Sequence, residues 1–207
     1  MREGSEFDAR AREWDDAGKI ERARRVADAI VAAIPWLSRA RVLEYGAGTG
    51  LLGFALRGRA AHVTLADSSR EMLAVASEKI EAAGAADLSV LPLDLTRDLP
   101  PAARFDVVCS LLTLHHVPDT AGLLRAFRVM TLPGGALCIA DLDAEDGSFH
   151  GPGVDVHRGF ERATLRTLIE AAGFADARFQ TACEIEKPTG SGRRYPVFLA
   201  TAWLPSR

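Results

Sequence analysis

The chain has 207 residues, of which 48% are hydrophobic, 26% charged and 7% aromatic, and its formal net charge is −3. This length fits one domain with a sizeable core, and the ordinary charged fraction excludes a globally disordered chain. The slightly acidic balance lacks the basic excess expected of a nucleic-acid-binding protein. We therefore predict a single domain over residues 1–207, with a helical cap over 1–38 and a core over 39–207, that acts without nucleic acid.

The three cysteines, Cys109, Cys138 and Cys183, lie far apart in apolar stretches, with no Cys-x-x-Cys pair. Such cysteines are typical of buried thiols in a reducing compartment rather than of a disulfide framework or a zinc knuckle. Residues 1–16 are charged and lack the apolar segment of a signal peptide, and no apolar run approaches the roughly 20 residues that span a bilayer. We expect a cytoplasmic protein with no membrane partner, present as a monomer or homodimer.

Hydrophobic periodicity predicts helices that alternate with strands along most of the chain. An amphipathic helix over 19–34 ends before Pro35, behind an opening segment that carries Phe7 and Trp14. The predicted strands cover residues 41–45, 62–66, 88–93, 105–111, 136–140, 177–184 and 197–203. The later predicted helices cover residues 51–56, 69–83 (with Ser68 as N-cap), 119–130 and 161–172. This alternation predicts a mostly parallel sheet with helices on both faces.

Three segments between the later elements lack periodicity. A Pro-Gly-Gly turn at 133–135 closes the helix over 119–130. A polar, glycine-rich loop at 141–159 contains two histidines, and a Gly/Arg/Pro-rich turn at 189–196 separates the last two strands. Loops at the carboxyl edge of a parallel sheet commonly carry binding residues, so the first of the two loops is a candidate for substrate contacts.

The strongest functional signal follows the first predicted strand, where residues 44–50 read Glu-Tyr-Gly-Ala-Gly-Thr-Gly and a helix begins at once. Glycines there permit positive φ and the close approach of a ligand to the main chain. The start of the helix offers free N–H groups to an anion, and open α/β sheets bind ligands at the carboxyl ends of their strands. A tight turn without a ligand needs fewer glycines, so we interpret this loop as a ligand site.

A dinucleotide site is one alternative for this loop. Residues 48–53 match Gly-x-Gly-x-x-Gly, and Asp67 follows about 20 residues later, as a ribose-binding acid does in that motif. The register is poor, because the strand ends at Tyr45 and the first glycine of the turn is Gly46. The chain has no Tyr-x-x-x-Lys pair for hydride chemistry and no second substrate domain. An NAD(P)-dependent oxidoreductase on a Rossmann fold stays open as the alternative function.

The ordered motifs resemble those of the class I S-adenosylmethionine-dependent methyltransferases over nearly the whole chain. Residues 44–50 are similar to the first motif of that family, and Asp67 resembles the acid that closes its second strand. Residues 93–95, Leu-Asp-Leu, resemble the pair that flanks the adenine, and residues 105–117 resemble the fourth motif. The opening segment, residues 7–15, resembles the small-molecule, type 11/12-like branch, which includes quinone-biosynthesis methyltransferases.

The resemblance implies a Rossmann-like, doubly wound α/β sheet of seven strands, mostly parallel with the last strand antiparallel. It implies S-adenosyl-L-methionine as cofactor, S-adenosyl-L-homocysteine as product and a small-molecule methyl acceptor whose identity the motifs leave open. In this interpretation the carboxylates accept from the ribose hydroxyls, the adenine amino group and the cofactor ammonium. The residues expected at the cofactor are Glu44, Gly46, Ala47, Gly48, Gly50, Asp67, Ser68, Asp94, Leu95, Ser110 and Leu111.

Methyl transfer needs a general base only where the acceptor must lose a proton. The candidate bases are His150 and His157 in the polar loop and His116 after the fourth predicted strand. Their alternatives are solvated loop histidines and, for His116, a packing role beside His115. A metal site is a further alternative, built from the two loop histidines with Asp141, Asp143 or Asp155. That spacing matches no compact metal motif, so we expect no bound metal.

Four other side chains are candidate substrate or lid residues, namely Phe7, Trp14, Arg194 and Tyr195. The two aromatic residues near the N-terminus would cover the cofactor and exclude water, and the arginine would hold a carboxylate or phosphate on the acceptor. The alternatives are a helix docked through two apolar anchors and a solvated hairpin turn. A non-catalytic binder of the S-adenosyl nucleoside stays open too, as does a macromolecule methyltransferase, although the chain lacks a basic accessory domain.

Overall fold

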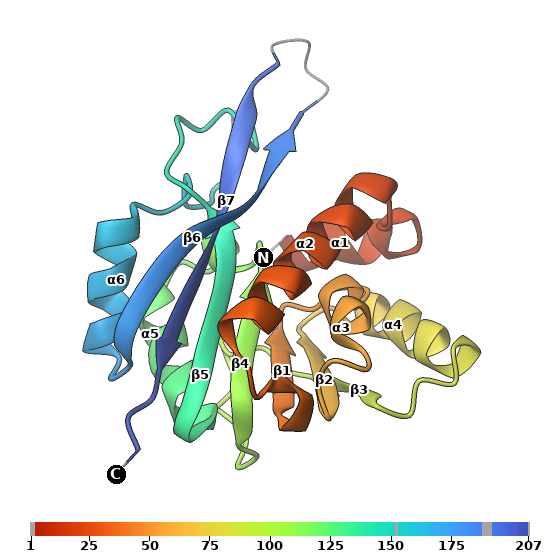
Figure 1. Cartoon of the computed structure of the whole chain (residues 1–207). Coiled ribbons are helices and arrows are strands. Elements are labelled where there is room, and N and C mark those ends of the chain that lie inside the picture. Colours follow the sequence, from red (N-terminus) through yellow and green to blue (C-terminus); the bar gives the residue numbers. More distant parts are fainter. Residues whose placement is uncertain (1–2, 152, 188–191, 207) are drawn as a thin grey trace.

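The computed structural model describes residues 3–151, 153–187 and 192–206. Its centre is a seven-stranded sheet in the order β3-β2-β1-β4-β5-β7-β6 (Figure 1). The strands are β1 (Arg41–Tyr45), β2 (His62–Asp67), β3 (Leu88–Pro92), β4 (Phe105–Leu111), β5 (Thr131–Leu142), β6 (Ala175–Glu186) and β7 (Arg194–Trp203). Pairing is parallel from β3 through to β5, and β7 runs antiparallel to both of its neighbours. The predicted Rossmann-like sheet with an antiparallel last strand is therefore confirmed.

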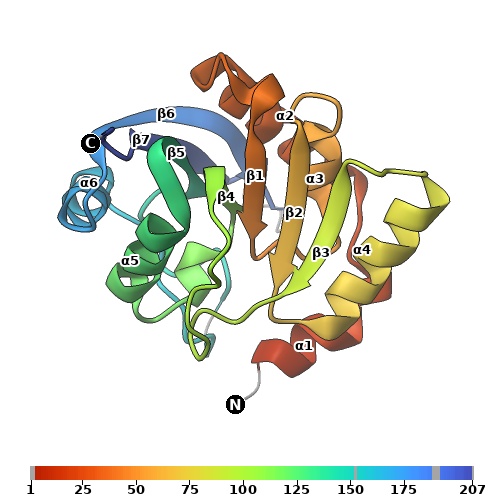
Figure 2. The same ribbon diagram turned by 90° about the horizontal axis from the view of Figure 1, so that it is seen from below.

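Helices cover both faces of this sheet (Figures 1 and 2). The helices are α1 (Glu3–Arg10), α2 (Ala17–Ala33), α3 (Leu51–Leu56), α4 (Arg70–Ala82), α5 (Thr120–Met130) and α6 (Arg162–Ala171). Short 3-10 turns are η1 (Ala11–Glu13), η2 (Leu37–Arg39) and η3 (Leu114–His116). Within the described residues, we find no helix with both the length and the apolar character needed to cross a membrane.

The core consists of two layers, because neighbouring residues of a strand point to opposite faces. Val42 of β1 packs in one hydrophobic cluster with Val26 and Ile30 of α2. The next residue along β1, Leu43, packs in the other cluster with Phe127 of α5. The central strands are buried on both faces, which explains why their sequences are continuous apolar runs rather than alternating ones.

The opening segment crosses the carboxyl edge of the sheet. In Figure 2, α1 lies beside α4, at the edge to which the arrowheads of β1 and β2 point. In Figure 1, the loop between β5 and α6 rises at the same edge, beside the β6–β7 hairpin. The fold thus brings the Gly-rich loop, the N-terminal segment and the polar loop to one side of the molecule, where α/β sheets bind ligands.

Several predicted element boundaries are wrong. The N-cap of α4 is Ser69 rather than Ser68, because the Ser69 hydroxyl accepts the Met72 N–H at 3.1 Å. The expected turn at 133–135 lies inside β5, which begins directly after α5. Thr131 already pairs with β4, and the regular ladder resumes at Ala136 after a shift in register. The glycines of the expected turn therefore lie in a bulge within the strand.

The last hairpin is longer than its sequence pattern predicts. The ladder between β6 and β7 continues as far as the pair Glu186 and Arg194. Arg194 and Tyr195 therefore belong to a strand and not to the turn predicted over 189–196. Residues 189–191 of that turn lie outside the described residues. The division of the chain into a cap over 1–38 and a core over 39–207 stays a prediction.

We expect Phe127→Ala to lower the free energy of unfolding by about 3–5 kcal/mol, because it leaves a cavity under α5. Phe127 is fully buried, and its ring meets that of Tyr45 edge-on at 5.4 Å. Val129 on the same helix is 43% exposed, so Val129→Ala is the matched control, with a change of about 0.5 kcal/mol or less. Urea unfolding followed by circular dichroism measures both, and equal losses would contradict this packing.

Candidate functional site

The Gly-rich loop after β1 turns through left-handed backbone at three glycines. Gly46, Gly48 and Gly50 have φ of +70°, +54° and +84°. A Cβ at Gly46 would lie 2.2 Å from the Thr113 side chain, so a larger residue has no space there. The N–H groups of Gly46 and Ala47 both donate to the Ala66 carbonyl of β2. The predicted loop residues are therefore fixed against β2 and the end of β4.

Asp67 ends β2 and faces this loop. Its Oδ2 accepts the Gly48 N–H at 2.7 Å, and its Oδ1 accepts the Ser69 N–H at 2.8 Å. Burial raises the pKa of Asp67 above its usual value, while the backbone N–H groups oppose that rise. Each carboxylate oxygen keeps a further lone pair for a ligand hydroxyl. Ser68, between these two residues, is exposed at the same edge.

Glu44 is buried beneath the loop, with 2% of its surface exposed. Its Oε2 accepts the Gly53 N–H of α3 at 2.8 Å. Burial raises the pKa of Glu44 to about 8, and the hydrogen bond from Gly53 opposes that rise. We expected this carboxyl to face the cofactor ammonium. The bond in the structure ties the end of β1 to α3 and thereby supports the loop from below.

The other residues expected at the cofactor lie at the ends of β3 and β4. Asp94 shapes the turn after β3, because its Oδ1 accepts the Thr96 N–H at 3.0 Å. The Leu95 N–H donates to the Tyr45 hydroxyl at 3.1 Å. Ser110 is fully buried in β4, and Leu111 beside it is half-buried. Parallel pairing of β3, β2, β1 and β4 places these residues along the same edge as Asp67.

The two aromatic lid candidates contact each other above the Gly-rich loop. The rings of Phe7 and Trp14 meet edge-on with centroids 5.6 Å apart. The Trp14 indole nitrogen lies 3.9 Å from the position that a Cβ on Gly48 would occupy. The Lys19 ammonium lies over the Trp14 ring, 4.7 Å from its centroid. The N-terminal segment therefore lies against the loop, and the lid role of the two rings stays a prediction.

Acidic residues beside these rings hold the segment in place. Asp8 accepts the Ser69 hydroxyl, and Asp15 accepts the Thr49 hydroxyl. Lys79 of α4 pairs with Asp15 at 2.8 Å. Sequence reasoning did not assign roles to these polar contacts. The repeated aromatic–aspartate pattern at 7–8 and 14–15 was the available signal, but it does not identify the partners.

Three histidines from two separate segments meet beside the ends of β4 and β5. The ring centroids of His115 and His116 are 4.1 Å apart, and that of His150 lies 5.0 Å from the first and 5.2 Å from the second. One ring nitrogen of each lies within 4.8 Å of the other two. We call His115, His116 and His150 the imidazole cluster. Phe7 contacts it through His116, with centroids 5.4 Å apart.

A buried carboxylate orients this cluster. Asp141 Oδ1 lies 2.6 Å from His115 Nδ1, and both side chains are almost wholly buried. Burial lowers the pKa of His116 to about 3 and that of His150 to about 4, with the nearby His115 adding to both shifts. These two rings are therefore neutral at pH 7. Such low pKa values make them weak general bases.

The remaining catalytic candidate lies outside the imidazole cluster. His157 Nε2 is 3.1 Å from the Val117 carbonyl oxygen and 3.3 Å from that of Pro118, so its ring stabilises the start of α5. Asp143 binds Arg162 at 2.7 Å instead of facing a histidine. The alternative metal set of His150, His157 and a nearby aspartate is not assembled. Instead, the structure pairs His150 with two neighbouring histidines after β4.

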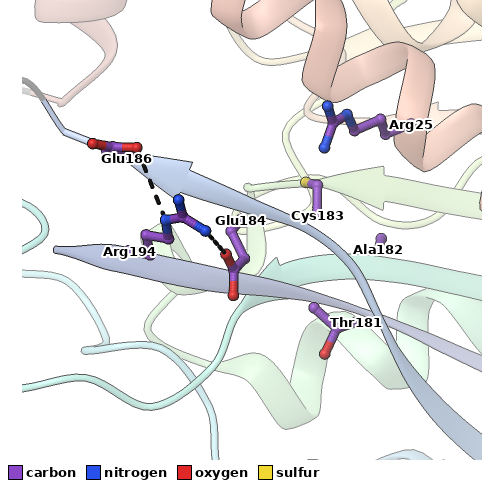
Figure 3. A pocket seen from close by; sticks show the side chains of 7 residues that line it. All are labelled: Arg25, Thr181, Ala182, Cys183, Glu184, Glu186 and Arg194. Atoms are coloured by element: carbon purple, nitrogen blue, oxygen red, sulfur yellow. Dashed lines mark hydrogen bonds and ion pairs between the residues drawn. The ribbon is translucent and has the colours of Figure 1, made fainter. Parts of the chain in front are cut away.

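The two acceptor candidates on β7 have local partners. Arg194 forms ion pairs with Glu184 at 3.3 Å and Glu186 at 3.9 Å across the hairpin. Figure 3 shows these three side chains together at a groove of about 450 Å³ between α2 and β6. In the order of the sheet, β4, β5 and β7 lie between β6, which lines this groove, and β1, which leads into the Gly-rich loop. Tyr195 is buried, and its hydroxyl is 2.8 Å from that of Ser148 in the polar loop.

Comparison with known proteins finds methyltransferases that are similar to the part of the chain carrying this site. Residues 42–135 match the family model described as a methyltransferase domain. Residues 42–135 are therefore similar to methyltransferase domains, in agreement with the resemblance that the motifs carry. The match covers the Gly-rich loop, Asp67 and the ends of β3 and β4. It favours the methyltransferase interpretation over the dinucleotide alternative.

Curated relatives of this methyltransferase domain act in ubiquinone biosynthesis. The chain is 38% identical over 117 residues to the ubiquinone biosynthesis O-methyltransferase of Marinobacter nauticus. That alignment covers 55% of this chain and 48% of the relative. It is 33% identical over 149 residues to the enzyme of the same name from Xanthomonas campestris pv. campestris. That alignment covers 69% of this chain and 62% of the relative. The chain thus spans about half to three fifths of the length of these relatives.

Solved structures share the fold at lower identity. The partner of the Trm112 methyltransferase activator from Haloferax volcanii has a TM-score of 0.78 at 22% identity, over 97% of this chain and 98% of that one. The N-methyltransferase NodS of Bradyrhizobium japonicum, in complex with S-adenosyl-L-homocysteine, has a TM-score of 0.70 at 17% identity, over 94% of this chain and 91% of that one. At these identities the likeness shows the fold alone.

We expect the stability of the cofactor-free protein to fall as pH rises toward 8, because of Glu44. Its pKa is raised from the usual 4.5 to about 8 in the folded state, so the neutral form stabilises the fold below pH 4.5 and that contribution is lost as pH approaches 8. Glu44→Gln stays neutral and should remove a decline of roughly 3–5 kcal/mol. Urea unfolding between pH 5 and 9 measures it, with the exposed Glu81→Gln as control. If the free energy of unfolding of Glu44→Gln fell with pH as steeply as that of the wild type, Glu44 would not be the cause of the decline.

Proposed function

We propose that the protein transfers the methyl group of S-adenosyl-L-methionine to a hydroxyl oxygen of a small aromatic acceptor. The observation that carries this proposal is the group of rings beside the Gly-rich loop, where Phe7 meets His116 at 5.4 Å and Phe149 meets His150 at 4.9 Å. Edge-on aromatic surroundings suit a planar acceptor. The relatives named as ubiquinone biosynthesis O-methyltransferases support oxygen as the acceptor atom.

In this proposal the cofactor lies across the carboxyl ends of β1, β2 and β3. The loop glycines leave the main chain open to it, and Asp67 accepts from the ribose hydroxyls with its remaining lone pairs. Asp94 and Leu95 flank the adenine. Ser110 and Leu111 place the end of β4 near the ammonium group, beside Glu44. Phe7 and Trp14 then lie over the bound nucleoside and exclude water.

The main contribution of the protein to this reaction is to align the acceptor with the methyl group of the cofactor. The acceptor hydroxyl gives up its proton to solvent, and a lone pair on its oxygen attacks the methyl carbon. The bond between that carbon and sulfur breaks with its electrons on sulfur, which yields a methyl ether, neutral S-adenosyl-L-homocysteine and one proton. Holding oxygen, carbon and sulfur in line supplies much of the acceleration. In this proposal, the acceptor hydroxyl lies next to the imidazole cluster.

The residues on β7 have supporting roles in this proposal. The Arg194 guanidinium is engaged by two glutamates, so an acceptor carboxylate would have to displace them. Tyr195 holds the polar loop through Ser148 and through its ring contact with Phe149 at 5.2 Å. Tyr195 therefore positions the segment that carries His150. In this proposal, the protein recognises the ring and the hydroxyl of the acceptor rather than a negative charge on it.

The proposal is tested with labelled S-adenosyl-L-methionine and a matched set of acceptors. Phenols, catechols, and the corresponding anilines and thiophenols carry the same ring with a different acceptor atom. We expect methyl ethers from the hydroxylated members, identified by mass spectrometry. Methylamines without methyl ethers would overturn the choice of oxygen. Binding of S-adenosyl-L-homocysteine with no turnover on any member would favour the non-catalytic binder.

We expect Asp67→Ala to weaken the binding of S-adenosyl-L-homocysteine by roughly 1–3 kcal/mol, because it removes charge-assisted hydrogen bonds to the ribose. Asp87→Ala is the matched control. Asp87 also accepts a backbone N–H, that of Gly58 at 3.2 Å, but it precedes β3 at the opposite edge of the sheet. Isothermal titration calorimetry measures both affinities. Equal affinity in the wild type and Asp67→Ala would remove Asp67 from the cofactor site.

A further inference from the structure

We propose that the imidazole cluster binds one divalent transition-metal ion, with His115, His116 and His150 as its three protein ligands. One ring nitrogen from each residue already lies within 4.8 Å of the other two. Nitrogens bound at about 2.1 Å around one tetrahedral ion lie roughly 3.4 Å apart, so small ring rotations complete the set. This proposal departs from the sequence-based expectation of no bound metal.

The pairing of His115 with Asp141 has the form that accompanies metal-bound histidine. A carboxylate only accepts hydrogen bonds, so His115 Nδ1 donates to Asp141 Oδ1 at 2.6 Å and Nε2 keeps its lone pair. That Nε2 is buried and has no hydrogen-bond partner among the described residues. Metal-binding histidines characteristically donate their other ring nitrogen to a carboxylate in this way, which fixes the tautomer and the ring orientation.

His150 carries a second nitrogen without a partner among the described residues, on a ring whose centroid is 5.0 Å from that of His115. Its Nε2 is buried and makes no hydrogen bond within the part of the chain that the structure describes. A buried polar atom without a partner costs free energy, so a ligand at this point would relieve that cost. Phe149 next to it is held between Tyr195 at 5.2 Å and the Lys187 ammonium at 4.2 Å, which fixes the approach of the loop.

The ligand atoms of the cluster indicate the kind of ion that it would bind. Metal ions bind imidazole in its neutral form. Imidazole ligands suit Zn²⁺, Cu²⁺, Fe²⁺ or Ni²⁺, whereas Mg²⁺ and Ca²⁺ prefer oxygen.

Three protein ligands leave a fourth position open, as in catalytic zinc sites. Phe7 contacts the cluster at His116, with ring centroids 5.4 Å apart, so the cluster borders the N-terminal segment beside the proposed acceptor site. The role of the ion rests on the proposed function. An acceptor hydroxyl in the open position would lose its proton to solvent more readily, because bound cations lower the pKa of a coordinated oxygen. Metal binding itself requires no acceptor and is measured without one.

The experiment uses the untagged, chelator-stripped full chain, because a histidine tag binds the same ions. Zn²⁺ binding is followed by calorimetry, and Co²⁺ binding by its visible absorption. We expect one ion per chain with a tetrahedral Co²⁺ spectrum. His150→Ala and His116→Ala should each weaken binding more than about 100-fold, and Asp141→Asn about 10–100-fold. His157→Ala and His62→Ala are matched controls that should keep the wild-type affinity, since His157 binds backbone carbonyls and His62 binds Ser89.

S-adenosyl-L-homocysteine-induced stabilisation, measured on the same variants, shows that each is folded. No Zn²⁺ binding by the wild type, or equal binding by the wild type and His150→Ala, would overturn the metal site. A metal-binding chain that forms no methyl ether would overturn the proposed function while the metal site stands. Methyl ether formation at an unchanged rate in excess chelator, together with the absence of Zn²⁺ binding, would overturn the metal site while the proposed function stands.

Discussion

Left-handed backbone at the glycines between β1 and α3 is the constraint on which the site depends. At Gly46 the chain passes so close to Thr113 that a Cβ would overlap its side chain, and φ of +70° suits glycine there. This path directs the Gly48 N–H to the Asp67 carboxylate, which also accepts from Ser69 at the start of α4. One carboxylate thereby joins the loop, β2 and α4. The glycines place no side chain of their own between this main chain and a ligand.

Most of the fold and the half of the site around Asp67 were predictable because their signals are local. Strand, Gly-rich turn and helix follow one another within residues 41–56, and apolar periodicity separates strands from helices. Errors arose where neighbouring residues offer the same chemistry. Ser68 and Ser69 are equivalent caps in the sequence, and only the observed hydrogen bond to Met72 distinguishes them. The bulge in β5 likewise depends on pairing with β4, which local sequence does not encode.

The imidazole cluster was beyond sequence reasoning, because it depends on the conformation of a long loop. His150 and His157 belong to similar polar segments, and nothing in their neighbours separates their roles. In the structure, contacts of Ser148 and Phe149 with Tyr195 turn His150 toward β4. The His157 backbone N–H instead donates to the His115 carbonyl, and its ring turns to the start of α5. Tyr195, which we predicted to contact the acceptor, thus supports His150 through the polar loop.

A buried Asp141 explains why the cluster has a defined orientation. A carboxylate removed from water is costly unless its oxygens are hydrogen-bonded. Asp141 meets that requirement with His115 Nδ1 and with the backbone N–H groups of His115 and Leu142. Two of these donors are backbone groups, so the carboxylate cannot follow a rotating ring without losing them. The His115 imidazole is held in turn, and its other nitrogen faces the neighbouring rings. Replacing this pair by apolar residues would fill the same space but remove the hydrogen bond that orients the His115 ring, so the pair contributes orientation beyond its packing.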